Sequence, residues 1–210
     1  DLDGRVIEIN YQIGTTPMLD SNPSKYSLYR VEKELKRLKE SAGATLKNIS
    51  KITKSKDPLE AFQMLKFYQV GHDPLDLSKK LNLIEQLNQT FTYQASFLAA
   101  RYIYKHHKFK GSIFLNLGTE SGTDLKTEDG SIVAEVFATT HIRNNDKLNK
   151  DIKRIKRVRG AKHRYVFFIA PMVPKGLYDY KPKSFDLAGV KIISLLDLKA
   201  NTSYPFATKN

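Results

Sequence analysis

Two acidic residues on a predicted β-hairpin are the part of this sequence best suited to chemistry. Asp124 and Glu135 lie in two runs of alternating apolar and polar residues, 123–127 and 131–138, with Asp129-Gly130 between them. Asp-Gly between two alternating runs favours a tight hairpin turn. Counting outwards from a two-residue type I′ loop places Asp124 directly opposite Glu135, on the same face of the sheet.

Two carboxylates in this arrangement repel each other unless a proton or a cation compensates, because their Cβ atoms are about 5 Å apart. Carboxylate oxygens are the ligands that Mg²⁺ prefers, so we expect Asp124 and Glu135 to hold one Mg²⁺. We expect Glu120 to help hold a second ion, and Lys126, on the same face, to balance charge or position a water. The alternative is a solvated sheet face whose charges never meet a metal.

A strongly basic segment follows the hairpin. Residues 145–158 predict a helix with Leu148, Ile152 and Ile155 as its core stripe, and nine basic residues lie between 147 and 164 with Asp151 as the only acid. Like charges this close along a helix repel each other, and bound phosphates would supply the missing negative charge. The alternative is an ordinary solvated face. Asn145 or Asp146 is expected to cap the helix. The expected DNA contacts are Lys147, Lys150, Lys153, Arg154, Lys156, Arg157, Arg143 and Asn144.

The overall charge supports a polyanionic partner. The 210 residues include 35 Lys and Arg against 22 Asp and Glu, a net charge of +13, which favours nucleic acid first and an anionic membrane second. No apolar run approaches the roughly 18 residues of a membrane span. The chain has no cysteine, which excludes disulfides and thiolate sites, and its first residues show no signal-peptide pattern. We therefore expect a cytoplasmic protein of a bacterial or archaeal cell, without membrane association.

The order of predicted elements indicates an α/β (α+β) fold with a central mixed sheet flanked by helices. Residues 77–210 read as a helix (77–105), three strands (112–117, 123–127, 131–138), a helix (145–158) and two strands (164–170, 190–196). The apolar side of the long helix is predicted at Leu81, Ile84, Leu87, Phe91, Leu98 and Tyr102. Residues 1–76 predict a separate lobe for DNA recognition or dimerisation: a strand (5–13), a helix (25–40) ending at 41–43, a weak helix or basic connector (44–56), and a helix (57–70) capped by Asp57.

From residue 80 to 198 the chain resembles the PD-(D/E)xK nuclease superfamily, which includes most type II restriction endonucleases. The family core is a helix, three meandering strands, a helix and a strand. Thr123-Asp124 would stand for the Pro-Asp of the motif and Glu135-Val136-Phe137 for its acid-x-Lys. The first helix of the family often carries an acid or Gln facing the site, here Gln94, with Glu85 and Gln89 as alternates. Phe137 replaces the motif lysine, whose role would pass to Lys126, or to Lys147 or Lys150.

The resemblance implies a Mg²⁺-dependent endonuclease that hydrolyses double-stranded DNA, a type II restriction enzyme first, acting as a homodimer. A structure-selective nuclease of the resolvase kind is the nearest alternative. A non-catalytic nucleic-acid-binding protein with a decayed site is another, and Phe137 favours it. A membrane-surface protein is a more remote alternative, because the basic helix has a narrow aliphatic stripe and no aromatic anchors.

Overall fold

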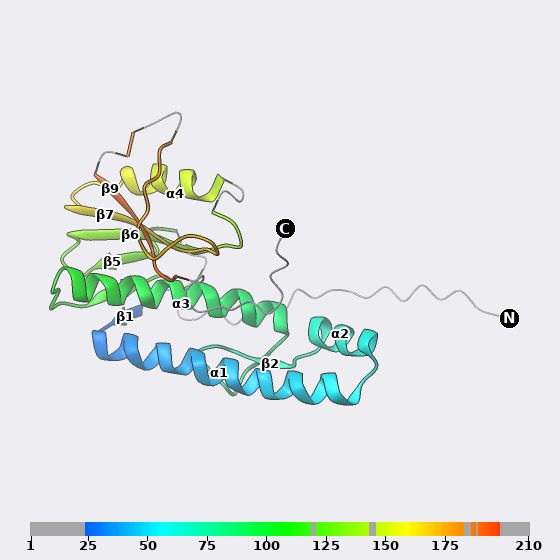
Figure 1. Ribbon diagram of the computed structural model, residues 1–210. Helices are drawn as coiled ribbons and strands as arrows, with labels where there is room; N and C mark the ends of the chain where they lie inside the picture. The colour runs from blue at the N-terminus through cyan, green and yellow to red at the C-terminus, as the bar shows by residue number, and fades with distance from the viewer. Residues whose placement is uncertain (1–23, 119–120, 143–145, 183–185, 188, 198–210) are drawn as a thin grey trace.

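A mixed seven-stranded sheet with helices on both faces forms the centre of the protein (Figure 1). The computed structural model describes residues 24–118, 121–142, 146–182, 186–187 and 189–197. Its helices are α1 (Leu28–Ser55), α2 (Pro58–Phe67), α3 (Leu83–His106) and α4 (Lys147–Lys156). Its strands are β1 (Ser24–Tyr26), β2 (Gly71–His72), β3 (Lys80–Leu81), β4 (Ile113–Leu115), β5 (Leu125–Thr127), β6 (Ile132–Ala138), β7 (His163–Ile169), β8 (Gly176–Leu177) and β9 (Val190–Ser194). The predicted α/β class with a central mixed sheet is confirmed.

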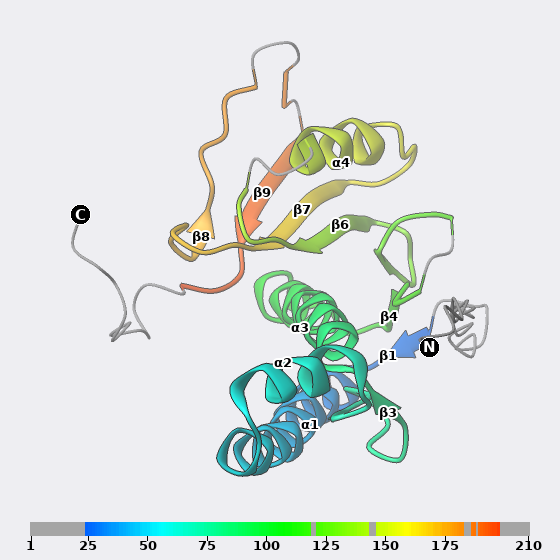
Figure 2. The same cartoon turned by 90° about the vertical axis from the view of Figure 1, so that its right-hand side faces the viewer.

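The sheet combines an antiparallel meander with a parallel crossover. Its strand order is β1-β4-β5-β6-β7-β9-β8; β4, β5 and β6 pair antiparallel, whereas β6, β7 and β9 pair parallel. Helix α4 connects β6 to β7 across one face, and α3 covers the opposite face (Figure 2). From residue 83 the chain therefore runs α3-β4-β5-β6-α4-β7.

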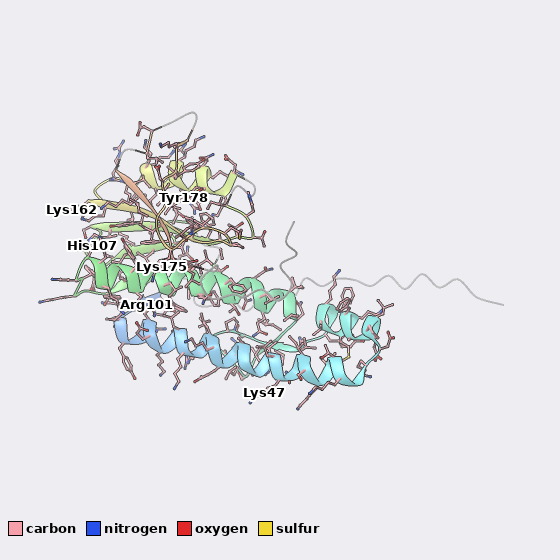
Figure 3. The ribbon with its side chains drawn as sticks, in the orientation of Figure 1. Lys47, Arg101, His107, Lys162, Lys175 and Tyr178 are labelled. Atoms are coloured by element: carbon pink, nitrogen blue, oxygen red, sulfur yellow. The ribbon has the colours of Figure 1, made fainter. Side chains whose placement is uncertain are left out.

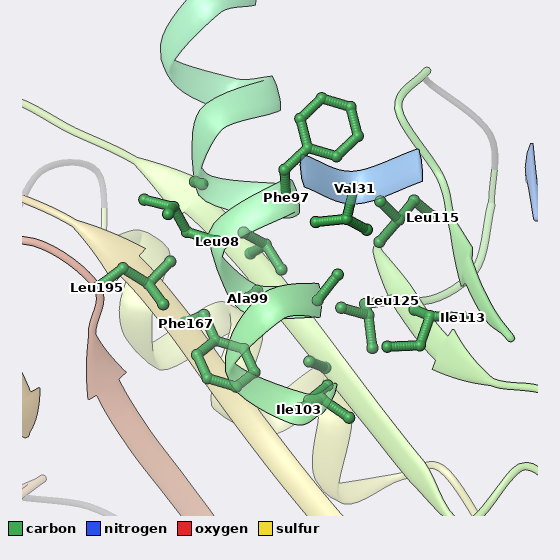
Figure 4. Close-up of a cluster of buried hydrophobic side chains, with 14 of the residues drawn as sticks. Val31, Phe97, Leu98, Ala99, Ile103, Ile113, Leu115, Leu125, Phe167 and Leu195 are labelled. Carbon is green, nitrogen blue, oxygen red and sulfur yellow. The ribbon is translucent and has the colours of Figure 1, made fainter. Parts of the chain in front are cut away.

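Strand β6 is buried on both faces, which explains its nearly continuous apolar character. Ile132, Ala134 and Val136 join the core under α3, and Val133 and Phe137 join the core under α4. On the α3 side, Phe97, Leu98 and Ile103 of the helix pack with sheet residues such as Leu125 and Phe167 (Figure 4). Glu135 points to the α4 side with Val133 and Phe137, because side chains alternate along a strand.

Only part of the predicted apolar side of α3 is correct. Leu98 is buried and Tyr102 is half-buried, whereas Ile84, Leu87 and Phe91 are 43–50% exposed. The buried face instead carries Tyr93, Phe97 and Ile103 with small residues between them. Alanines at 95, 99 and 100 bring the helix close to the sheet, and a hydrophobic-period count gives such small residues little weight.

The predicted end of the first helix at residues 41–43 is wrong, because α1 continues unbroken to Ser55. Tertiary contacts hold the continuation: Ser41 Oγ donates to the carbonyls of His72 and Asp73, both at 3.2 Å, and Thr45 Oγ1 donates to Gln86 Oε1 at 2.6 Å. These contacts offset the low helix propensity of Ser41 and especially Gly43. The segment after residue 44 is thus helix rather than connector.

The N-terminal lobe is joined closely to the rest of the protein. Strand β1 pairs with β4, and α1 packs along α3. The β2–β3 hairpin spans residues 71–81, so the predicted lobe boundary at residue 76 lies within that hairpin. Asp57 caps α2 as predicted, accepting from the backbone N–H groups of Leu59 and Glu60. The strand predicted at 5–13 lies outside the described residues. None of the described helices has the length and apolar character required to cross a membrane.

Candidate functional site

The predicted register of the β5–β6 hairpin is confirmed, although its turn is of another type. Leu125 pairs with Ala134 and Lys126 with Val133, as the count predicts. Gly130 has φ +68°, but Asp129 does not have the positive φ that a type I′ turn requires. The backbone N–H of Gly130 instead donates to the Thr127 carbonyl, and Asp129 Oδ1 accepts from Thr127 Oγ1 at 2.7 Å. This wider loop leaves the register unchanged.

Asp124 lies immediately before β5 and is fixed from both neighbouring strands. Its side-chain Oδ2 accepts the backbone N–H of Val136 at 2.7 Å, and its own carbonyl accepts the N–H of Asn116 at 2.9 Å. The side chain is 25% exposed. Asp124 therefore lies beside Glu135 on the α4 side of the sheet, with an orientation set by the backbone.

Glu135 is fully buried in the middle of β6. The pKa of its carboxyl is raised to about 8: burial is the largest cause, the negative charge of Asp124 adds to it, and the contact with Arg154 opposes both. Such a carboxyl keeps its proton near neutral pH unless a stronger cation replaces that proton. The charge conflict expected from the sequence is therefore present.

Arg154 is the basic residue that meets these carboxylates. Its Nη2 contacts Glu135 Oε2 directly and lies 3.8 Å from Asp124 Oδ2 and 3.5 Å from Asp151 Oδ1. Asp151 is buried and also accepts from Lys147 Nζ at 2.9 Å. Arg154 is 49% exposed, so one of its ends reaches solvent while the other covers Glu135.

Sequence reasoning missed the positions of Asp151 and Arg154. The sequence presents Asp151 only as the single acid of a basic helix and predicts that Arg154 contacts DNA. The available signal was spacing: Asp151 precedes the core residue Ile152, and Arg154 follows Asp151 by three, which places both beside the buried stripe of α4.

The carboxylates could hold a single Mg²⁺ ion with only a few ligands from the protein. Glu135 Oε1 and Asp151 Oδ2 are buried and have no hydrogen-bond partner within the described structure. Mg²⁺ commonly takes one or two carboxylates and completes its sphere with water and phosphate oxygens. No group of three or more acidic or histidine side chains suited to a metal occurs among the described residues. Glu120, the expected ligand of a second ion, lies outside them.

The residues expected to replace the motif lysine are placed differently from one another. Lys126 is on the predicted face, but it lines an open pocket of about 560 Å³ beside Gly130 and Arg159. Lys147 pairs with Asp151, and Lys150 is exposed. Phe137 stacks on Phe168, with ring centroids 5.8 Å apart, and is a core residue.

The candidate residues of the long helix lie on the other side of the sheet. Gln94 and Gln89 are half-buried and Glu85 is exposed, all three on α3, whereas Glu135 faces α4. The structure does not bring their helix to the face that carries the two carboxylates.

The predicted DNA contacts separate into two groups. Lys150, Lys153 and Arg157 are exposed along α4. Lys147 pairs with Asp151, Arg154 contacts Glu135, and Lys156 Nζ contacts Asp186 Oδ1 at 2.9 Å. Arg143 and Asn144, like the expected cap Asn145, lie outside the described residues. The alternative cap is wrong: Asp146 adopts a left-handed conformation with φ 54°, and its side chain makes no capping hydrogen bond.

No protein-family model, curated protein or solved structure matches this chain.

Proposed function

We propose that this protein is a Mg²⁺-dependent endonuclease acting on double-stranded DNA, a type II restriction enzyme of the PD-(D/E)xK kind. The supporting observation is that Asp124 and Glu135, from neighbouring strands, converge on one cationic group, Arg154. The order α3-β4-β5-β6-α4-β7 around them is also the order of elements in that superfamily's core. Such an enzyme would act in the cytoplasm of a bacterial or archaeal cell.

In this proposal Asp124 and Glu135 hold the Mg²⁺, and each has a distinct environment. The bound ion would supply Lewis-acid stabilisation of the phosphate and lower the pKa of a water. Asp124 is partly exposed and oriented by the Val136 N–H, so it offers an oxygen on the solvent side. Glu135 is buried below it, with its Oε1 unpartnered in the described structure.

Arg154 takes the charge-balancing role of the motif lysine. It is the basic side chain in contact with both carboxylates, whereas Phe137 at the motif position belongs to the core. Arg154 covers Glu135, so its guanidinium would have to leave this carboxyl for Glu135 to hold the ion. The exposed end of Arg154 can then reach a phosphate of the DNA. A planar guanidinium can donate two parallel hydrogen bonds to a phosphate group.

Exposed cations on the same side of the sheet would hold the DNA backbone. Lys150, Lys153 and Arg157 lie along α4, and Lys126 and Arg159 line the open pocket beside the hairpin. The pocket also includes Thr123, the neighbour of Asp124. A strand held here would thus run past the carboxylates. We propose that two copies of the chain act together where both strands are cut at a symmetric sequence.

The test is cleavage of supercoiled plasmid with and without Mg²⁺. Asp124→Asn and Glu135→Gln are each expected to abolish cleavage while leaving DNA binding, measured by fluorescence anisotropy, within about twofold. Asp179→Asn removes an acid that is 84% exposed on the loop after β8 and serves as the matched control. Cleavage that persists in both site variants would refute the assignment.

A test of Arg154 separates its role from that of the acids. Arg154→Ala is expected to lower the cleavage rate about 100-fold or more, with Arg154→Lys partly restoring it, since a lost charge-stabilising donor costs roughly that factor. Faster cleavage by Arg154→Ala would show that the arginine only obstructs the carboxylates.

A second candidate is a nucleic-acid-binding protein without catalysis. Arg154 already contacts both acidic side chains without a metal, and this observation favours that candidate. It predicts salt-dependent binding of duplex DNA with no nicking in Mg²⁺ or Mn²⁺. Adding a four-way junction to the assay distinguishes a structure-selective nuclease, which would cut the junction and spare linear duplex.

A further inference from the structure

A second pocket lies on the face of the sheet opposite the carboxylates. It has a volume of about 540 Å³ and opens between α3, the end of β9 and the start of β8. Arg101 on α3 and Lys175 before β8 both line it, and both are labelled in Figure 3. Its size is in the range of small-molecule sites.

The floor of this α3–β9 pocket is apolar, and its rim is cationic. Leu98, Ile193 and Leu195 are at most 6% exposed and form the floor. The basic side chains among its lining residues are Arg101, Lys105, His106 and Lys175, and none of its lining residues is Asp or Glu. An apolar floor with basic side chains around it suits an organic molecule that carries an anionic group.

The wall of the pocket includes a preformed aromatic pair. The rings of Tyr102 and His106, one helical turn apart on α3, are stacked with centroids 4.9 Å apart and planes 18° from parallel. Tyr102 is also held edge-on by Phe167 at 5.2 Å, which fixes its orientation. A planar ring fits beside such a pair, because every nucleobase presents a π-face.

The anion-binding groups are positioned by their own contacts. Glu32 Oε2 lies 3.6 Å from Arg101 Nη1, which helps to hold the guanidinium at the rim. Lys175 is placed by the antiparallel pairing of Gly176 with Ser194. The two cations thus come from separate, structurally fixed elements.

We propose that the α3–β9 pocket binds a nucleoside phosphate, with the phosphate between Arg101 and Lys175 and the base near Tyr102. The source is either a free mononucleotide or the phosphorylated end of a DNA strand, since both present the same group. The proposal is independent of the nuclease assignment, because the pocket and Glu135 lie on opposite faces of the sheet.

Titration calorimetry with 5′-AMP, adenosine and inorganic phosphate tests this assignment on the full chain. We expect 5′-AMP to bind at least 10-fold more tightly than either fragment. Lys175→Gln and Arg101→Gln should each weaken it about 10-fold, as expected for loss of a charge-assisted hydrogen bond. Lys47→Gln, an exposed lysine on α1 (Figure 3), is the matched control and should bind as the unaltered protein does.

A 5′-phosphorylated single-stranded oligonucleotide distinguishes the two sources. Lys175-dependent binding of 5′-AMP supports a free nucleotide, and Lys175-dependent binding of the oligonucleotide alone supports a strand end. Three results would overturn the proposal: 5′-AMP that binds no more tightly than phosphate does, affinity unchanged in both pocket variants, or no binding of either 5′-AMP or the oligonucleotide. Asp124→Asn should leave this binding intact while it abolishes cleavage, so that the two proposals fail separately.

Discussion

Replacing Glu135 by Gln should make the protein more stable at alkaline pH and change it little at acid pH. Gln has nearly the same shape and can still accept from Arg154, but it cannot ionise. The folded protein holds the Glu135 proton more tightly than the unfolded chain, because the pKa is about 8 in one and near the ordinary value of 4.5 in the other. The stability that this proton contributes is therefore complete below about pH 4.5 and is lost as the pH rises to about 8.

The size of the effect follows from the two pKa values. Deprotonating the buried carboxyl between about pH 5 and about pH 9 should lower the free energy of unfolding by about 4 kcal/mol in the unaltered protein. Glu135→Gln should lack this loss, so the difference between the two proteins should grow with pH. Asp151, whose pKa burial also raises, and other titrating groups are common to both proteins and largely cancel.

Urea unfolding followed by circular dichroism at several pH values measures this difference. The control is Glu40→Gln, which removes an exposed carboxylate 3.8 Å from Lys36 and should change stability by no more than about 0.5 kcal/mol throughout. A stability difference that stays constant between acid and alkaline pH would refute the reasoning. Glu135 would then be ionised in the folded protein, with Arg154 alone outweighing the cost of burial.

Three further changes test other parts of the structure. Gly71→Ala should lower the free energy of unfolding, measured with urea, by about 1–3 kcal/mol. The new Cβ would lie 2.2 Å from Gln86 Oε1, which already accepts two hydrogen bonds. Gly43→Ala inside α1 is the control: its Cβ meets nothing within 4 Å, so it should raise the free energy of unfolding by about 0.5–1 kcal/mol. Phe137→Lys restores the family motif, but it should destabilise the protein by more than about 3 kcal/mol and not raise cleavage. The reason is that the side chain at 137 is 6% exposed and lies beside Lys147. A stable, more active variant would contradict this. Three exposed basic residues near α4 can be changed to Gln together: Lys150, Lys153 and Arg157. This should reduce the slope of log affinity for DNA against log salt concentration by up to about 3. An unchanged slope would remove α4 from the DNA-binding surface.

Local patterns in the sequence were sufficient for the elements that carry the site. Alternating residues on either side of Asp129-Gly130 determine the register of β5 with β6, because a shift of one residue would turn Ala134 and Val136 away from the α3 core. The same register brings Asp124 beside Glu135. It persists although the turn is not of the predicted type, since burial of both faces constrains β6 more strongly than the loop does.

Contacts between distant segments decided what those patterns left open. Helix α1 continues past Gly43 because His72, Asp73 and Gln86 bond its polar side chains, and no pattern within residues 41–43 contains that information. The buried face of α3 depends on small residues whose value appears only when a sheet packs against them.

The site shows the same division between sequence and tertiary structure. The sequence by itself determined that two carboxylates would meet and that a cation had to compensate them. Only the tertiary structure selected Arg154 from nine basic residues, because the crossover from β6 to β7 turns its side of α4 toward the sheet. Periodicity orients a helix about its own axis, but the partner that each side chain meets depends on packing between elements.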